Sequence, residues 1–244
     1  MTPAFDSMTV RRTTALVVVP TYNEAENIRA LIEAVLAIPF PHEILVVDDA
    51  SPDGTAAIVE EMAGKDARIH LMRRAGKLGL GSAYLDAFRW ALSRDYALVV
   101  EMDADFSHDP GYLMALVKAS EDADLVLGSR YVPGGGTQGW SFLRKLISRS
   151  GCLYARTILG LSIRDLTGGF KCFRRGVLEA IPLDEVVTDG YGFQVEMTYR
   201  AVRKNFRVAE VPILFVDRKV GKSKMSWKIF LEAARKVWWM RFHL

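Results

Sequence analysis

Asp103 and Asp105 are separated by a single residue, and their type and spacing indicate a chemical function more clearly than any other pair in this sequence. They follow an apolar run at 96–102 that predicts a buried strand. Ligands of α/β proteins bind beyond the carboxyl ends of the strands. Carboxylates this close repel each other, and a divalent cation, which commonly accompanies a phosphorylated substrate, removes the repulsion. The pattern indicates a metal site, and a pair of solvated turn aspartates is the alternative.

Cations suited to phosphate lie mostly in the second half of the chain. The first 140 residues carry 12 Lys and Arg against 20 Asp and Glu, whereas the remaining residues carry 20 against 9. Such a basic half indicates phosphate groups or an anionic surface as partner. Arginine binds phosphate through two hydrogen bonds and lysine as a point charge, with ordinary surface charge as the alternative. The cations that we single out are Arg130, Arg144, Arg218 and Lys224.

Alternating strands and helices must position these residues. Apolar runs predict strands at 15–19, 44–47, 68–72, 96–102, 124–127 and 208–215. Helical periodicity predicts helices at 24–37, from 55, at 80–94, 142–159 and 192–204, and from 226, with a glycine-rich turn before the helix at 192–204. We expect Asn23 to cap the first helix. The alternation predicts a single α/β domain with a mostly parallel sheet covered on both faces.

Two further motifs end strands in the first half of the chain. Pro20, Tyr22 and Glu24 lie in a turn that could place an aromatic ring against a base and a carboxylate near a ribose, and an ordinary strand-to-helix turn is the alternative. Asp48 and Asp49 could accept hydrogen bonds from a base or a ribose hydroxyl. The alternative there is the capped start of a helix, although both aspartates precede the turn.

A glycine-rich loop at 76–82 fits neither of the common phosphate-binding patterns. Gly81 is followed by Ser82 where a Walker loop needs lysine, and Tyr84 stands where the dinucleotide fingerprint needs its third glycine. We interpret the loop as a helix N-terminus close to a ligand. This excludes a nicotinamide dehydrogenase.

Composition limits the compartment and the partners. Cys152 and Cys172, the only cysteines, match no zinc or redox spacing, which predicts free thiols in a reducing compartment. The sequence contains no signal peptide, no apolar run of about 18 residues and no nucleic-acid-binding signature, so we expect a cytoplasmic protein whose contact with a membrane is peripheral. The segment 227–244 mixes basic and aromatic residues, which suits either an interfacial helix on anionic lipid or a core-packing helix.

In sequence order, the motifs form one series: PTYNE, VVDDASPDGT, EMDADFSHDP, GSRY, DLTGGFKCFRR, GYGFQVEM and FVDRKVGKSK. The series closely resembles the polyprenol (dolichol) phosphate mannosyltransferases, inverting enzymes of the GT-A fold, over about residues 14–224. The first three segments occur in many GT-A transferases. DLTGGFKCFRR and RKVGKSK are specific to the polyprenyl-phosphate branch.

The resemblance implies GDP-mannose as donor, a polyprenyl (dolichyl) monophosphate lipid as acceptor, Mg²⁺ or Mn²⁺ as cofactor, and no nucleic acid. It implies a flexible tail at 1–12, a GT-A catalytic domain at 13–225 and, at 226–244, an amphipathic helix packed on the domain or at the membrane surface. Many bacterial relatives continue into transmembrane helices where this sequence stops. We therefore expect amphipathic helices or a separate membrane-anchoring protein to bring the enzyme to the cytoplasmic face of the membrane, for glycolipid biosynthesis.

The resemblance also assigns site residues, in overlapping sets. The nucleotide sugar is bound by Pro20, Tyr22, Glu24, Asp48, Asp49, Asp103, Arg130, Arg218 and Lys224. The acceptor phosphate is bound by Arg144, Ser148, Arg218 and Lys224. The residues expected to act in catalysis are Asp105, Arg130, Arg144, Arg218 and Lys224. The metal is held by Asp103 and Asp105, with Ser107 where some relatives have a glutamine ligand, so the third ligand is either Ser107 or a water.

The expected reaction is attack of the acceptor phosphate on the anomeric carbon from the side opposite the leaving GDP. Phosphate is largely ionised at neutral pH, so no essential general base is expected. The alternatives are a polyprenyl-phosphate glucosyltransferase that uses UDP-glucose, a non-enzymatic lipid-surface or nucleotide-binding module, and a nucleotidyltransferase. The last of these lacks its glycine-rich basic signature at the first strand, where PTYNE stands.

Overall fold

The computed structural model describes residues 14–217 and 227–244, and the side chains of the last helix from Arg235 onward. The expected tail at 1–12 and the expected boundary between 225 and 226 lie outside the described residues. Within the described ranges, no helix is both long enough and apolar enough to cross a membrane.

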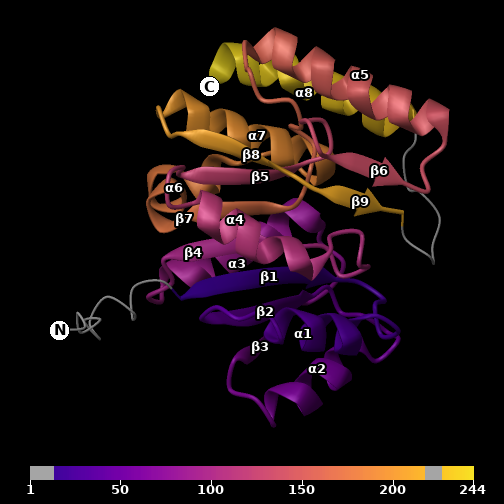
Figure 1. The fold of residues 1–244 in the computed structure, drawn as a ribbon, viewed down its shortest axis with the longest axis vertical. Helices are drawn as coiled ribbons and strands as arrows, with labels where there is room; N and C mark the ends of the chain where they lie inside the picture. The colour runs from indigo at the N-terminus through magenta and orange to yellow at the C-terminus, as the bar shows by residue number, and fades with distance from the viewer. Residues whose placement is uncertain (1–13, 218–226) are drawn as a thin grey trace.

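A seven-stranded sheet in the order β3-β2-β1-β4-β7-β5-β8 forms the centre of the molecule (Figure 1). Its strands are β1 (Ala15–Thr21), β2 (His42–Asp48), β3 (Ile69–Arg73), β4 (Leu98–Glu101), β5 (Leu125–Ser129), β7 (Lys171–Arg174) and β8 (Val208–Pro212). A separate parallel pair consists of β6 (Gly136–Gln138) and β9 (Leu214–Val216). The α-helices are α1 (Ile28–Leu36), α2 (Thr55–Ala63), α3 (Leu80–Leu92), α4 (Leu113–Ala119), α5 (Phe142–Leu159), α6 (Arg175–Ala180), α7 (Gly190–Arg203) and α8 (Trp227–His243). Short 3₁₀ turns are η2 (Pro110–Tyr112) and η3 (Leu183–Glu185).

Strand β1 shows why the sheet is covered on both faces. Ala15, Val17 and Val19 pack into one apolar core with α1, α2 and α4. Leu16 and Val18 pack into a second core on the opposite face with α3, α6 and α7. A strand buried on both faces needs an uninterrupted apolar run, which is the pattern that predicted it. The expected single α/β domain with a mostly parallel sheet is confirmed.

The antiparallel strand β7 is the main element that the sequence analysis missed. It lies between β4 and β5 and runs opposite to both. The prediction of a turn in this region was incomplete, because the segment Lys171–Arg174 is only four residues long and begins and ends with a cation. Its antiparallel direction brings the preceding loop at 165–170 to the edge of the sheet where β1, β2 and β4 end.

Two other predictions about elements were wrong. The expected strand at 208–215 divides into β8, which pairs with β5, and β9, which pairs with β6. Pro212 lacks the N–H that a continuing ladder needs, which accounts for the break. Asn23 caps no helix, because α1 begins at Ile28 and the backbone of Asn23 has φ +62°, outside the extended region of a cap residue.

Backbone strain marks the carboxyl edge of the sheet. Non-glycine residues with positive φ follow β1 (Asn23, +62°), β2 (Ala50, +56°) and β4 (Phe106, +60°). Such conformations are costly and cluster at functional sites. The strained turns therefore point to the same edge that the aspartate motifs indicated.

Candidate active site

The turns after β1 and β2 form one structural unit. The backbone N–H of Asn23 donates to Ser51 Oγ, and that of Ala25 donates to Asp53 Oδ2, each at 3.0 Å. Segments that the sequence analysis treated as separate motifs thus fix each other's backbone. Tyr22 and Glu24 are held within this unit at the edge of the sheet.

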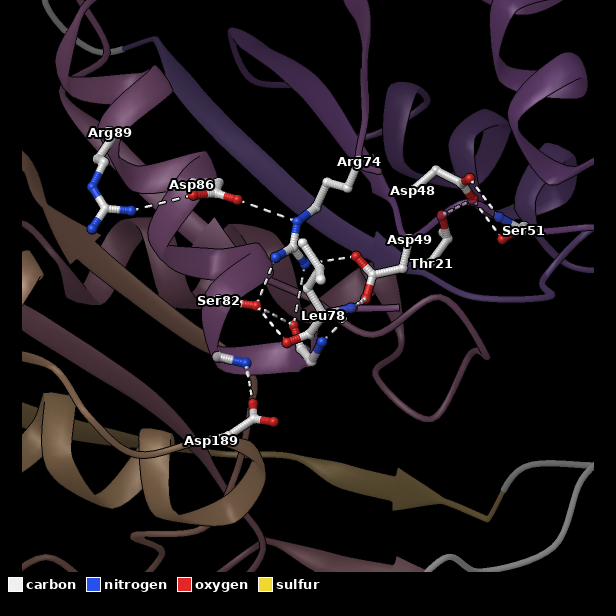
Figure 2. A network of polar contacts seen from close by, with 12 residues as sticks. Thr21, Asp48, Asp49, Ser51, Arg74, Leu78, Ser82, Asp86, Arg89 and Asp189 are labelled. Atoms are coloured by element: carbon white, nitrogen blue, oxygen red, sulfur yellow. Dashed lines mark hydrogen bonds and ion pairs between the residues drawn. The ribbon is translucent and has the colours of Figure 1, made fainter. Parts of the chain in front are cut away.

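The carboxylate of Asp48 is buried and already bound within the protein. Thr21 Oγ1 donates to it at 2.9 Å, and Ser51 donates through its backbone N–H at 2.9 Å and its hydroxyl at 2.6 Å (Figure 2). Asp48 therefore shapes the turn from which a nucleoside pocket would be built. Direct contact of Asp48 with a base stays a prediction.

Asp49 belongs to a second network, which centres on Arg74 (Figure 2). The Arg74 side chain is 5% exposed and forms a 2.6 Å ion pair with Asp49, and its Nη2 donates to Ser82 Oγ at 2.6 Å. Asp49 Oδ2 also accepts the backbone N–H groups of Leu78 and Gly79 at 3.1 and 3.3 Å. Arg74 thus fixes the glycine-rich loop against the end of β2. The sequence analysis missed this residue, although its position directly after β3 was a usable signal.

The glycine-rich loop reaches the expected nucleoside pocket. Lys77 Nζ lies 3.8 Å from the centre of the Tyr22 ring. At the start of α3, the backbone N–H of Gly81 donates to Asp189 Oδ1 at 2.6 Å. Gly79 has φ +103°, and a Cβ there would overlap the Asp189 carboxylate, so only glycine fits. The helix N-terminus therefore binds an anion from the protein itself.

The loop after β4 holds the two aspartates of the expected metal site. Asp105 Oδ1 accepts the backbone N–H and the hydroxyl of Ser107 at 3.0 and 2.6 Å. The backbone N–H of Asp103 donates to His108 Nδ1 at 3.1 Å, which assigns the His108 proton to Nε2. Burial lowers the pKa of His108, so the imidazole is neutral at neutral pH. His108 stacks on Phe170 with ring centres 4.9 Å apart, and this pins the loop to the segment before β7.

The oxygen ligands of this loop suit Mg²⁺ or Mn²⁺. Magnesium is commonly bound by one or two carboxylates together with substrate phosphates and water. Within the described ranges, no group of three or more His, Cys, Asp or Glu side chains could share a metal ion. Asp103 and Asp105 therefore fit a cation that takes its other ligands from a diphosphate and from water. Ser107 as third ligand stays a prediction, since its hydroxyl proton is directed at Asp105.

Arg130 is bound to a partner that the sequence analysis did not name. It is 6% exposed, and its Nε and Nη2 donate to the two oxygens of the fully buried Asp165 at 2.7 and 2.6 Å. Nη2 also donates to Thr167 Oγ1 at 2.9 Å. Burial would lower the pKa of Arg130 and raise that of Asp165, but the contact between the two charges outweighs burial in both. Contact of Arg130 with a phosphate stays a prediction and would have to use Nη1.

Aromatic rings gather the expected acceptor-site residues. The guanidinium carbons of Arg144 and Arg130 lie 4.2 and 5.4 Å from the centre of the Trp140 ring. Tyr131 donates its hydroxyl proton to Ser148 Oγ at 2.6 Å. The structure thus brings Arg130, Arg144 and Ser148 together, although they come from two elements of the chain.

Strand β9 connects the acceptor-site residues to the loop at 103–108, which we call the metal loop. The backbone N–H of Val216 donates to the carbonyl oxygen of Ser107 at 3.4 Å, and the next residue, Asp217, forms a 2.7 Å ion pair with Arg144. Arg218 and Lys224 lie outside the described residues, so their expected roles stay predictions.

Comparisons with known proteins agree with this architecture. The family described as Glycosyl transferase family 2 matches residues 16–181. A polyprenol monophosphomannose synthase of Mycolicibacterium smegmatis is 48% identical over 245 residues, which cover 98% of this chain and 92% of that protein. An undecaprenyl-phosphate mannosyltransferase of Micrococcus luteus is 47% identical over 222 residues, which cover 91% of each chain.

Among solved structures, the fold is similar to that of glucosyl-3-phosphoglycerate synthase from Mycobacterium tuberculosis. The TM-score is 0.67 at 18% identity, over 99% of this chain and 85% of that chain. A structure of that enzyme in complex with Mn²⁺, uridine diphosphate and glucosyl-3-phosphoglycerate gives a TM-score of 0.65 at 19% identity, over 97% and 83% of the two chains. The family match spans most of the sheet, and the two curated relatives span nearly the whole sequence. The chain therefore belongs to glycosyl transferase family 2 and is a glycosyltransferase with the GT-A fold.

Proposed function

We propose that this enzyme transfers mannose from GDP-mannose to a polyprenyl monophosphate, with inversion, to give a β-linked polyprenyl phosphate mannose. The observation that carries the proposal is the placement of two complementary clusters at one edge of the sheet. Asp103 and Asp105 suit a metal-bound diphosphate, while Arg144 and its aromatic neighbours suit a second phosphate. The names of the two curated relatives support the acceptor class and the sugar.

On the donor side, Tyr22 and Glu24 would contact the nucleoside within the unit that joins β1 and β2. Lys77, which lies over the Tyr22 ring, would close the pocket from the glycine-rich loop. Asp103 and Asp105 would hold the divalent cation, which neutralises the charge that builds on the leaving diphosphate. The Mn²⁺ bound in the structurally similar glucosyl-3-phosphoglycerate synthase supports a divalent cofactor.

On the acceptor side, the obstacle to reaction is repulsion between phosphates rather than a weak nucleophile. A monophosphate with a second pKa of about 6 is largely ionised at neutral pH and needs no base. Arg144 and Ser148 would bind this phosphate, offset its repulsion from the donor and align an oxygen with the anomeric carbon. Arg218 and Lys224 are proposed to act with them from the segment that follows Asp217.

The lipid acceptor requires contact with a membrane, and α5 is suited to it. The first turns of this helix expose Phe142 (81%), Leu143 (63%) and Leu146 (50%) next to Arg144 and Ser148. Apolar residues interspersed with cations favour binding at an anionic membrane surface. A helix that lies in the cytoplasmic face of the membrane would receive the lipid phosphate at its own arginine.

Helix α8 extends this surface, because it lies alongside α5 (Figure 1). It exposes Trp238 (46%) and Phe242 (75%), while Val237 and Met240 are buried. One face of the helix packs on the core, and the aromatic residues exposed elsewhere on it support a role at the membrane surface. A separate membrane-anchoring protein is the alternative route to the lipid, and it would not require this apolar surface.

The test is transfer of radiolabelled sugar to a short-chain polyprenyl phosphate, with GDP-mannose and UDP-glucose compared in Mg²⁺, Mn²⁺ and EDTA. The proposal expects labelled mannolipid that depends on the metal. Glucolipid alone would assign the enzyme to the glucosyltransferases. No product from either donor, with added anionic vesicles, would contradict the proposal.

A further inference from the structure

Polar side chains are buried directly behind the metal loop with few hydrogen bonds. Tyr84, Glu101 and Lys171 are completely buried, and Gln194 is 2% exposed; we call these four residues the buried polar cluster. Within the described part of the chain, neither Glu101 oxygen, neither amide atom of Gln194 nor the Tyr84 hydroxyl has a hydrogen-bond partner. Buried polar groups are nearly always hydrogen-bonded, so such a concentration requires an explanation.

Lys171 ties the cluster to three elements of the fold. It lies directly opposite Glu101 in the β4–β7 pair, which places the two side chains on the same face of the sheet. Lys171 Nζ donates to the Gln194 carbonyl oxygen at 2.6 Å and to Thr198 Oγ1 at 2.8 Å, both on α7. Movement of the end of β4 is therefore restrained by β7 and α7 together.

The cluster adjoins Asp103. Glu101 is the last residue of β4 and precedes Asp103 by two residues. Burial raises the pKa of Tyr84, and the nearby charges of Asp103 and Glu101 raise it further. Burial also raises the pKa of Glu101, against the effect of Lys171 and Gln194, yet no hydrogen bond of normal geometry joins Glu101 to Gln194.

Gly169 leaves a gap between the cluster and the metal loop. A Cβ atom on this residue would lie 3.5 Å from Gln194 Nε2, 3.9 Å from Asp103 Oδ1 and 3.7 Å from His108 Cε1. All three side chains thus face the same small space. The unpartnered amide of Gln194 borders this space on one side, and a carboxylate of the expected metal site borders it on the other.

We propose that Glu101, Lys171 and Gln194 are positioning residues for the divalent cation, which hold the Asp103 carboxylate in place through water bound among the unpartnered atoms of Glu101 and Gln194. Buried waters typically make about three hydrogen bonds to such groups. Residues that orient a metal ligand in this way commonly change metal affinity by about 10- to 100-fold when replaced. This inference rests on the proposed function only in placing the cation at Asp103 and Asp105.

A purely stabilising role is the alternative, and the burial of Glu101 directly opposite Lys171 argues against it. Replacing buried ionisable groups by well-packed apolar residues is often neutral or stabilising, so the burial of such groups is weak evidence for stability. The double replacement Glu101→Met with Lys171→Met removes one buried carboxyl group and one buried amine and fills a similar volume.

The experiment measures the Kd of Mn²⁺ in the presence of GDP, by the electron paramagnetic resonance signal of free Mn²⁺. We expect the Glu101→Met, Lys171→Met double variant to unfold at the wild-type temperature or above and to bind Mn²⁺ at least about 10-fold more weakly. The matched control replaces both Glu196 and Arg200 by Met. These residues form a buried ion pair, at 2.9 Å on α7, and Glu196 also accepts a hydrogen bond from the Thr188 hydroxyl. We expect the control to keep the wild-type Kd.

If the double variant fails to fold, two single variants test the inference instead. Gln194→Met removes the unpartnered amide. Gly169→Ala fills the gap at ordinary contact distances of 3.5 Å or more. Both are expected to fold and to weaken Mn²⁺ binding.

Wild-type Mn²⁺ affinity in the folded variants would overturn the inference, and so would a wild-type protein that binds no Mn²⁺ with GDP. Because binding is measured without transfer, a protein that binds Mn²⁺ and GDP but makes no mannolipid would contradict the proposed function alone.

Discussion

Replacement of Asp165 by asparagine is the perturbation whose size the structure determines best. Asp165 is fully buried and Arg130 is 6% exposed, so solvent barely screens their charges. The carboxylate accepts from Arg130 Nε, Nη2 and the backbone N–H, at 2.7, 2.6 and 2.9 Å. An asparagine amide keeps one acceptor oxygen and turns an N–H₂ group toward the guanidinium.

The expected loss of unfolding free energy follows from the Arg130 charge, which stays buried when Asp165 becomes neutral. Removing one partner of a buried ion pair typically costs about 3–5 kcal/mol, because the other charge remains buried without compensation. Domains of this kind have a free energy of unfolding of about 5–15 kcal/mol, so Asp165→Asn should remove a large part of it. Arg130→Met combined with Asp165→Asn removes both charges and should be less destabilised than the sum of the single variants.

The assay is urea unfolding of the wild type, both single variants and the double variant. The pKa of Asp165 is held below its ordinary 3.8, chiefly because the Arg130 charge outweighs burial. A carboxyl group with a lowered folded-state pKa stabilises the fold above its ordinary pKa, and this contribution is lost as pH falls through the folded value. The difference between the wild type and Asp165→Asn should therefore be constant at neutral pH and shrink below pH 3.8. Two results would refute this reasoning. One is a loss of unfolding free energy under about 1 kcal/mol for Asp165→Asn at pH 7, and the other is a double variant whose loss equals the sum of the two single losses.

Other predictions concern the metal loop, the apolar core that contains α1, and the exposed apolar residues of α5. Ser107→Ala should raise the Mn²⁺ concentration needed for half-maximal transfer, because Asp105 loses a 2.6 Å hydrogen bond, and an unchanged metal titration would contradict this. His42→Phe should lower the free energy of unfolding in urea by about 1–3 kcal/mol, since it removes the ring nitrogens that lie 2.7 and 2.9 Å from the carbonyl oxygens of Phe40 and Val35, and a wild-type value would contradict the assignment. Phe142→Ser with Leu146→Ser should weaken binding to anionic vesicles in a sedimentation assay. The double variant should keep wild-type turnover of a short, water-soluble acceptor, and unchanged sedimentation would contradict the role of α5.

The sequence predicted the arrangement of the sheet better than its contacts. Continuous apolar runs such as Ala15–Val19 indicated buried parallel strands, and such strands end at one edge, which placed Asp103 beside the turns at Tyr22 and Asp48. Strand β7 escaped detection because Lys171 is a buried cation, which apolar periodicity cannot reveal. Burial of the Lys171 ammonium group becomes favourable only when α7 supplies hydrogen-bond acceptors from residues 23 and 27 positions away in the sequence.

The partners of the site residues show the same limit. Arg130 was identified as a phosphate-binding cation from its position after a strand, but its ion pair joins residues 35 positions apart. The pairing of Arg74 with Asp49 spans 25 positions. A single sequence indicates which residues carry charge and where the strands end. Which charges neutralise each other depends on packing that local patterns do not encode.

The central claim is that the metal at Asp103 and Asp105 supports transfer of mannose to a lipid phosphate. The most direct measurement compares wild type and Asp105→Asn for transfer of labelled mannose from GDP-mannose to polyprenyl phosphate, in Mn²⁺, in EDTA, and after Mn²⁺ is restored. Folding of the variant is checked by thermal unfolding. We expect product only from the wild type with metal, and recovery when metal returns. Equal product in EDTA, or full transfer by folded Asp105→Asn, would contradict the account.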